Sequence, residues 1–193
     1  MLENLQKYRI VLASNSPRRR ELLAGLGIGF EVRVLPDIDE NYPQSLAANE
    51  TAEYIAVKKA HAYEGHTVPD ELLITADTVV IVGEEVLGKP TNADEAHAML
   101  RLLSGRTHQV ITGVCLSGSG RERHFSVVTD VTFKELSDEE IDYYVTTYKP
   151  YDKAGAYGIQ EWIGYIGCTG LNGSYFNVMG LPIQRIYAEL TTF

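Results

Sequence analysis

Three consecutive arginines at positions 18–20 stand where a helix is expected to begin, because Ser16 is a good N-cap residue and Pro17 suits the first helical position. The helix dipole disfavours a cation in the first turn by about 0.3–1 kcal/mol. The same turn offers unpaired backbone N–H groups and the hydroxyls of Ser14 and Ser16, which suit an anion. The segment therefore predicts a polyphosphate site, with a solvated basic turn as the simpler alternative.

These arginines also lead to an expectation about stability. Because the dipole disfavours them, Arg18→Ala or Arg19→Ala is expected to weaken triphosphate binding while leaving stability unchanged or slightly improved. Ser14 is interpreted as a hydrogen-bond donor and not as a nucleophile, because it lies among arginines and the chain has no GxSxG motif. The glycine fingerprints of dinucleotide-binding and P-loop proteins are also missing.

Further charged residues lie at or near the ends of apolar runs: Asp39, Glu40, Lys59, Asp77 and Lys89. Each has an ordinary explanation on its own, such as a solvated loop, a turn carboxylate or a surface lysine. Asp77 stands out, because an unpaired carboxylate inside an apolar strand is costly. As a set they fit a triphosphate, which needs cationic clamps, and Mg²⁺ or Mn²⁺, which needs oxygen ligands. The set indicates phosphoryl or nucleotidyl chemistry, in which Asp77 either takes a proton from the attacking water or holds the metal together with Asp39 or Glu40.

Composition limits the class of protein. The length of 193 residues fits one domain, and the net charge of −9 argues against a nucleic-acid or anionic-membrane partner. The two cysteines, Cys115 and Cys168, and the five histidines show no metal-ligand spacing. Such cysteine usage is typical of a reducing compartment, and no apolar run approaches the ~20 residues of a membrane span. We expect a cytoplasmic protein.

Alternating strand and helix patterns predict an α/β or α+β fold, with a mixed sheet whose faces are covered by helices. Strands are expected at residues 8–14, 30–35, 72–82, 108–116, 125–133 and 162–166, and helices after Pro17, at 51–63, 92–103 and 137–147, and after Pro182. The segment 148–160 is too rich in glycine and proline for regular structure and is a candidate site loop.

The chain carries a series of motifs in a characteristic order: LASNSPRRRELL, DIDE, AVKKA, ADTVV, GKP, LSGRTHQVITGV, DKAGAYGIQ and NGSYFNVMGLP. With these motifs over nearly its whole length, the chain closely resembles the Maf family of nucleoside triphosphate pyrophosphatases. The combination of ADT with a later GIQ resembles the branch that acts on dTTP and UTP.

The resemblance implies a fold and a reaction. The fold is a single Maf-like domain over residues 1–193 with two lobes, an elongated mixed sheet flanked by helices and a central cleft, similar to the inosine-triphosphate pyrophosphatases. The reaction converts a nucleoside triphosphate and water into a nucleoside monophosphate and pyrophosphate, with a divalent metal cation. A homodimer is implied as well.

The resemblance also implies roles for individual residues. By position, the residues implied to bind phosphate are Ser14, Arg18, Arg19, Lys59 and Lys89. The implied loop carboxylate is Asp39, with Glu40 beside it, and the implied general base is Asp77. Base preference falls on Arg18, Thr78 and Gln160. A glutamine amide matches the N3–H donor and O4 acceptor of uracil and thymine, so UTP and dTTP are the expected substrates. Glu161 departs from the family, whose members often have glycine after GIQ.

Two other functions stay open. A phosphatase or kinase would release or transfer the terminal phosphate and would yield no pyrophosphate. A nucleotide-binding regulator of cell division and septum formation would use the same cationic residues without essential turnover, and Asp77 would then do no chemistry.

Overall fold

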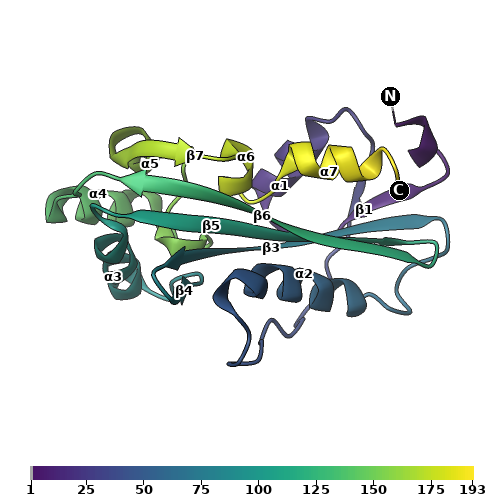
Figure 1. Cartoon of the computed structure of the whole chain (residues 1–193), viewed down its shortest axis with the longest axis horizontal. Helices are drawn as coiled ribbons and strands as arrows, with labels where there is room; N and C mark the ends of the chain where they lie inside the picture. Colours follow the sequence, from purple (N-terminus) through teal and green to yellow (C-terminus); the bar gives the residue numbers. More distant parts are fainter. Residues whose placement is uncertain (1) are drawn as a thin grey trace. The chain divides into compact units, whose positions relative to one another are not determined.

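The computed structural model describes residues 2–193 (Figure 1). Within these residues the strands form one mixed sheet in the order β2-β1-β3-β5-β6-β7, and β4 pairs with β3 beside this path. The strands are β1 Arg9–Leu12, β2 Glu31–Val32, β3 Glu71–Val82, β4 Glu85–Leu87, β5 Thr107–Gly118, β6 Arg121–Phe133 and β7 Cys168–Asn172. β1 is parallel to β2 and β3, whereas β4 is antiparallel to β3, and β7 to β6. The predicted class, a mixed sheet with flanking helices, is confirmed.

Most helices begin where the sequence predicts. The helices are α1 Pro17–Ala24, α2 Thr51–His61, α3 Ala93–Leu103, α4 Asp138–Tyr148, α5 Trp162–Gly167, α6 Tyr175–Val178 and α7 Ile183–Leu190, with short 3-10 turns η1 Glu3–Leu5, η2 Ala48–Glu50 and η3 Ala154–Ala156. Ser16 and Asn92 each accept a hydrogen bond from the backbone N–H three residues later, and Ser137 and Glu140 form a complete capping box. In the part of the chain described, no helix is long and apolar enough to span a membrane.

The chain folds into two compact units. The first comprises the residues up to Asp77, Thr112–Val127 and Gly180–Phe193, and the second comprises Thr78–Ile111 and Val128–Met179. Strands β3, β5 and β6 each contribute residues to both units. A single domain with two lobes over residues 1–193 stays a prediction.

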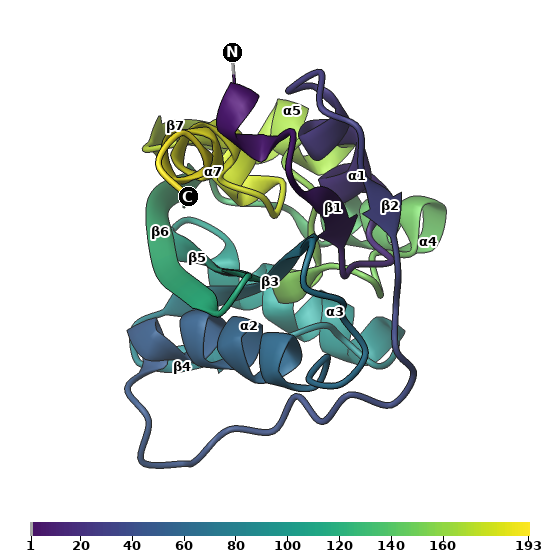
Figure 2. The same ribbon diagram turned by 90° about the vertical axis from the view of Figure 1, so that its right-hand side faces the viewer.

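In the first unit, helices cover both faces of the sheet. On one face α2 packs through Ala56 against strand residues that include Leu73. Gly113 of β5 permits this close approach, because a Cβ there would lie only 2.3 Å from the backbone carbonyl of Ala52. On the opposite face lies α7, which buries Ile186 (Figure 2). The packing of α2 fixes the direction in which its lysines point.

In the second unit, α3, α4 and α5 share a hydrophobic core to which Leu100, Tyr144 and Ile163 contribute. His108 of β5 is buried in this unit, and a hydrogen bond of 2.8 Å joins its Nε2 to the hydroxyl of Tyr157. Burial lowers the pKa of His108 to about 4, so the ring is neutral at pH 7. This bond anchors the loop at 148–160 to the sheet.

Two of the expected strands differ from the structure. The strand expected at 162–166 is wrong, because Trp162–Gly167 is the helix α5 and the strand β7 follows it. Ile163, Gly164 and Gly167 are buried while Tyr165 is exposed, which is the spacing of a helix face. A Cβ at Gly164 would lie 1.9 Å from the carbonyl oxygen of Ile159, so this tight turn depends on glycine.

The strand expected at 30–35 is reduced to the two exposed residues of β2. Beyond β2 the backbone leaves the ladder. The N–H of Arg33 still bonds the carbonyl of Leu12, but that of Leu35 donates to the hydroxyl of Tyr63 instead. A side-chain acceptor from Tyr63, in the turn that follows α2, therefore replaces further strand pairing.

Candidate active site

The beginning of α1 has the predicted arrangement of cap and arginines. The hydroxyl of Ser16 accepts a hydrogen bond from the backbone N–H of Arg19, and Pro17 occupies the first turn. No acidic side chain stands in this turn to balance the dipole. Arg18 is half-buried, whereas Arg20 is exposed. The positive end of the helix and the adjacent cations therefore form an electropositive terminus.

Arg19 is held by backbone carbonyls. Its Nε donates to the carbonyl of Gly180 at 2.7 Å, and its Nη1 donates to the carbonyl of Ala76 at 2.9 Å. Burial lowers the pKa of the Arg19 guanidinium, while the charge of Asp77 raises it. Arg19 thus ties α1 to the strand residue that precedes Asp77. Because these donors satisfy buried backbone carbonyls, we expect removal of Arg19 to lower stability, in contrast to the expectation from the helix dipole alone.

Ser14 lies beside Arg19 in the turn between β1 and α1. It is buried, and its Oγ accepts hydrogen bonds from the backbone N–H of Ser16 at 3.2 Å and from Nη1 of Arg19 at 3.5 Å. Both bonds use the oxygen as acceptor, so the hydroxyl hydrogen can be donated to an anionic ligand. The role of Ser14 as a donor to such a ligand stays a prediction.

Asp77, Lys59 and Glu40 come together although they lie on three different segments. The ammonium Nζ of Lys59, on α2, is 2.8 Å from Oδ1 of Asp77 and 3.0 Å from Oε1 of Glu40. Asp77 is only 8% exposed, and this pairing supplies the partner that a buried carboxylate needs. Lys59 is therefore a bridge between two carboxylates, an arrangement that no local sequence pattern predicts.

Asp39 points to a different partner. Its Oδ2 lies 2.6 Å from Nζ of Lys58, and its Oδ1 accepts the backbone N–H of Asn41. The hydrogen bond from Lys58 lowers the pKa of Asp39. Glu40 is thus the loop carboxylate that shares a lysine with Asp77. Among residues 2–193, no three His, Cys, Asp or Glu side chains are grouped so that they could hold a metal ion together.

Three of the predicted site residues belong to the second unit. Thr78 follows Asp77 in β3 and is half-buried, and Lys89 is exposed in the loop after β4. The carbonyl of Gly88, next to Lys89, accepts the backbone N–H of Gly155 at 3.0 Å. Oε1 of Gln160 is buried and has no hydrogen-bond partner within residues 2–193. Such an acceptor is costly unless a ligand or an ordered water supplies a donor.

A polar cluster around Glu161 was not predicted from the sequence. Tyr144 and Lys153 both contact the Glu161 carboxylate. The motif DKAGAYGIQ contains Lys153 and ends one residue before Glu161, so the signal was present, but the third member, Tyr144, is far away in the sequence.

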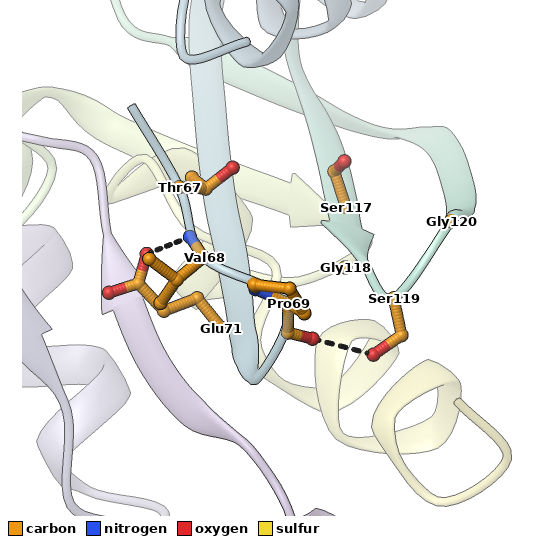
Figure 3. A pocket seen from close by; sticks show the side chains of 8 residues that line it. All are labelled: Thr67, Val68, Pro69, Glu71, Ser117, Gly118, Ser119 and Gly120. Atoms are coloured by element: carbon orange, nitrogen blue, oxygen red, sulfur yellow. Dashed lines mark hydrogen bonds between the residues drawn. The ribbon is translucent and has the colours of Figure 1, made fainter. Parts of the chain in front are cut away.

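A separate pocket of about 360 Å³ lies in the first unit at the turn between β5 and β6 (Figure 3). Glu71 lines it and accepts the N–H of Val68, and the hydroxyl of Ser119 donates to the carbonyl of Pro69. None of the predicted site residues lines this pocket.

Comparison with known proteins agrees with the motifs. The family model for Maf-like protein matches residues 9–193. A protein of Phocaeicola vulgatus named dTTP/UTP pyrophosphatase is 66% identical over 190 residues, which cover 98% of each chain. Proteins with the same name from Parabacteroides distasonis, 61% identical over the full length of both chains, and Bacteroides thetaiotaomicron, 58% identical over 98% of each, are similar as well. The chain therefore belongs to the Maf-like protein family.

Proposed function

We propose that this chain is a nucleoside triphosphate pyrophosphatase that hydrolyses dTTP and UTP to the monophosphate and pyrophosphate. The observation that carries the proposal is the buried Asp77 carboxylate bridged by Lys59 to Glu40, in a chain that is 66% identical to a protein named dTTP/UTP pyrophosphatase. A carboxylate held in this way beside an electropositive helix terminus suits hydrolysis of a phosphoanhydride.

The chemistry follows from the contacts of Asp77. Lys59 holds Oδ1, so Oδ2 is the atom that accepts a proton from water. The water oxygen forms a bond to the α-phosphorus, the bond from that phosphorus to the bridging oxygen breaks, and pyrophosphate leaves with the electron pair. Arg18, the Ser14 hydroxyl and the N–H groups at the beginning of α1 stabilise the charge on the phosphates. We assign Lys89 the same role.

A divalent cation fits the residues present. Asp77 and Glu40 lie close enough to share one cation, the Lys59 ammonium, and their carboxylates offer only oxygen ligands, as Mg²⁺ or Mn²⁺ prefers. Asp77 and Glu40 would hold the ion, with Asp39 as the alternative loop carboxylate. When bound, the ion would neutralise phosphate charge and lower the pKa of water.

Base selection is assigned to Gln160. Its unpartnered Oε1 can accept the N3–H of uracil or thymine, while its amide group donates to O4. Cytosine reverses the donor and acceptor at these two positions. Thr78 and Arg18 would then place the base relative to the reacting phosphorus, where small errors of position are costly.

The test is incubation with UTP, dTTP, CTP, ATP and GTP in Mg²⁺, with separate detection of pyrophosphate and orthophosphate. The proposal requires pyrophosphate, formed fastest from UTP and dTTP. Orthophosphate would instead indicate a phosphatase, and a triphosphate that stays bound in Mg²⁺ would indicate the regulator of cell division. Faster turnover of purine nucleotides would refute only the base assignment.

Sedimentation of the same sample tests the implied homodimer.

A further inference from the structure

A buried polar network holds the residue that follows Gln160. The Glu161 side chain is 20% exposed, and its Oε1 lies 3.1 Å from Nζ of Lys153. Its Oε2 accepts a hydrogen bond from the hydroxyl of Tyr144, on α4. Both carboxylate oxygens are therefore engaged by donors from other parts of the second unit.

The hydroxyl of Tyr144 makes a second bond within the same loop. It accepts the backbone N–H of Gly158 at 3.0 Å while it donates to Glu161. Burial raises the pKa of this fully buried tyrosine, so it keeps its proton and remains a donor. One hydroxyl thus binds the loop on both sides of Gln160.

The network is also tightly packed. Lys153 is 8% exposed, and its Nζ lies 2.7 Å from Oδ1 of Asp152 as well as beside Glu161. A Cβ on Gly158 would lie 2.9 Å from Cδ of Glu161 and 3.1 Å from Cε of Lys153. Glycine at this position lets the backbone reach the Tyr144 hydroxyl.

We propose that Glu161 is a positioning residue for base selection, which, with Tyr144 and Lys153, fixes the loop so that the Gln160 amide is already oriented for a pyrimidine edge. The inference rests on the proposed role of Gln160. An amide whose backbone is fixed on both sides loses less freedom when it binds a base, so discrimination is stronger.

The first variant is Glu161→Gln, which removes the charge paired with Lys153 and one of the two acceptors. The second is Tyr144→Phe, which keeps the ring but removes the hydroxyl shared by Gly158 and Glu161. In both, the ratio of kcat/KM for UTP to that for ATP is expected to fall roughly tenfold, because the amide is displaced. Loss of folded protein lowers both rates equally and leaves this ratio unchanged.

Two matched substitutions serve as controls. Glu139→Gln changes an exposed glutamate of α4, and Tyr143→Phe changes the exposed tyrosine beside Tyr144. Neither is expected to change the ratio. A ratio that stays at the wild-type value in either network variant overturns the inference, as does an equal change in the controls.

Hydrogen exchange of the Gly158 amide provides a readout that does not depend on turnover. Exchange is expected to accelerate about tenfold or more in both network variants and in neither control, because the bond to Tyr144 is lost or loosened. If the wild type hydrolyses no triphosphate or shows no base preference, the proposed function fails, yet this exchange pattern would still support loop positioning. Unchanged exchange in the network variants overturns the inference regardless of activity.

Discussion

Adjacent arginines in one helical turn have different surroundings. Arg19 donates to two backbone carbonyls, Arg18 is half-buried, and Arg20 is exposed. The helix dipole acts on all three in the same way, but the tertiary fold brings the carbonyls of Ala76 and Gly180 to Arg19. We therefore expect that substitutions of these arginines change the free energy of unfolding and the catalytic activity to different extents.

Arg19→Ala is expected to lower the free energy of unfolding by about 2 kcal/mol, because buried carbonyls lose a charged donor. Arg18→Ala is expected to leave that free energy within about 0.5 kcal/mol of the wild type while weakening triphosphate binding. Urea unfolding without nucleotide checks both values. Equal stability of the two variants would contradict the distinction.

Asp77→Asn is expected to lower the rate of pyrophosphate release by about 10²–10⁴-fold, because the amide cannot take a proton from water. The fold should persist, since the change is nearly isosteric and Lys59 keeps Glu40 as a partner. Asp70→Asn, at an exposed aspartate just before β3, is the control. Near-normal turnover by a folded Asp77→Asn protein would exclude the assigned role.

Among the elements, β1, β2 and β3 are joined by one carboxylate at the beginning of β3. Glu71 is 3% exposed and lies 2.7 Å from Arg33, which follows β2, and 3.4 Å from Arg9 of β1. The hydrogen bonds from Arg33 hold the pKa of Glu71 below its usual value of 4.5. The charged form is therefore the one that stabilises the fold.

The sign of the pH effect follows from this lowered pKa. Glu71 contributes stability above pH 4.5, its unfolded pKa, and this contribution is lost as the pH falls through the lower pKa of the folded state. Glu71→Gln should cost about 2 kcal/mol at pH 7, and its difference in stability from the wild type should shrink toward zero as the pH falls through the lowered pKa of Glu71. The urea unfolding midpoints of the variant and the wild type, measured from pH 7 down to acidic pH, test this expectation. A stability difference that does not depend on pH would disprove it.

Local signals in the sequence predict most elements, and tertiary contacts account for the errors. Helix starts at Ser16, Asn92 and Ser137 depend on bonds within a few residues, so they are predictable. The helix α5 was expected as a strand because Trp162, Ile163 and Tyr165 suit strands, and these residue types do not reveal the tight turn that brings Gly164 onto Ile159, five residues earlier.

In the candidate site as well, some contacts are predictable from local sequence and others depend on tertiary packing. Ser14, Arg18 and Arg19 adjoin one cap and could be grouped from the sequence, whereas the Lys59 bridge depends on how α2 lies on the sheet. In the loop before α2, Asp39 pairs with Lys58, which leaves Glu40 as the loop carboxylate that pairs with Lys59. This pairing depends on the conformation of the loop. In a helix or a strand, the periodicity of apolar residues shows which way a side chain points, but a loop has no such periodicity.

At the scale of the whole molecule, the net charge of −9 opposes a highly anionic triphosphate. Binding then depends on local cations and on a divalent ion that neutralises the phosphates. Excess EDTA is expected to stop hydrolysis, and added Mg²⁺ to restore it fully, as pyrophosphate release will report. Full activity in EDTA would contradict the metal assignment, whereas failure of Zn²⁺ to substitute would not.

The proposed hydrolysis requires that water attacks the α-phosphorus of a pyrimidine nucleoside triphosphate. Hydrolysis of UTP in ¹⁸O-labelled water, followed by mass spectrometry of the products, tests it most directly. We expect UMP that carries one labelled oxygen, together with unlabelled pyrophosphate. Label in pyrophosphate, or products consisting of UDP and orthophosphate, would contradict it.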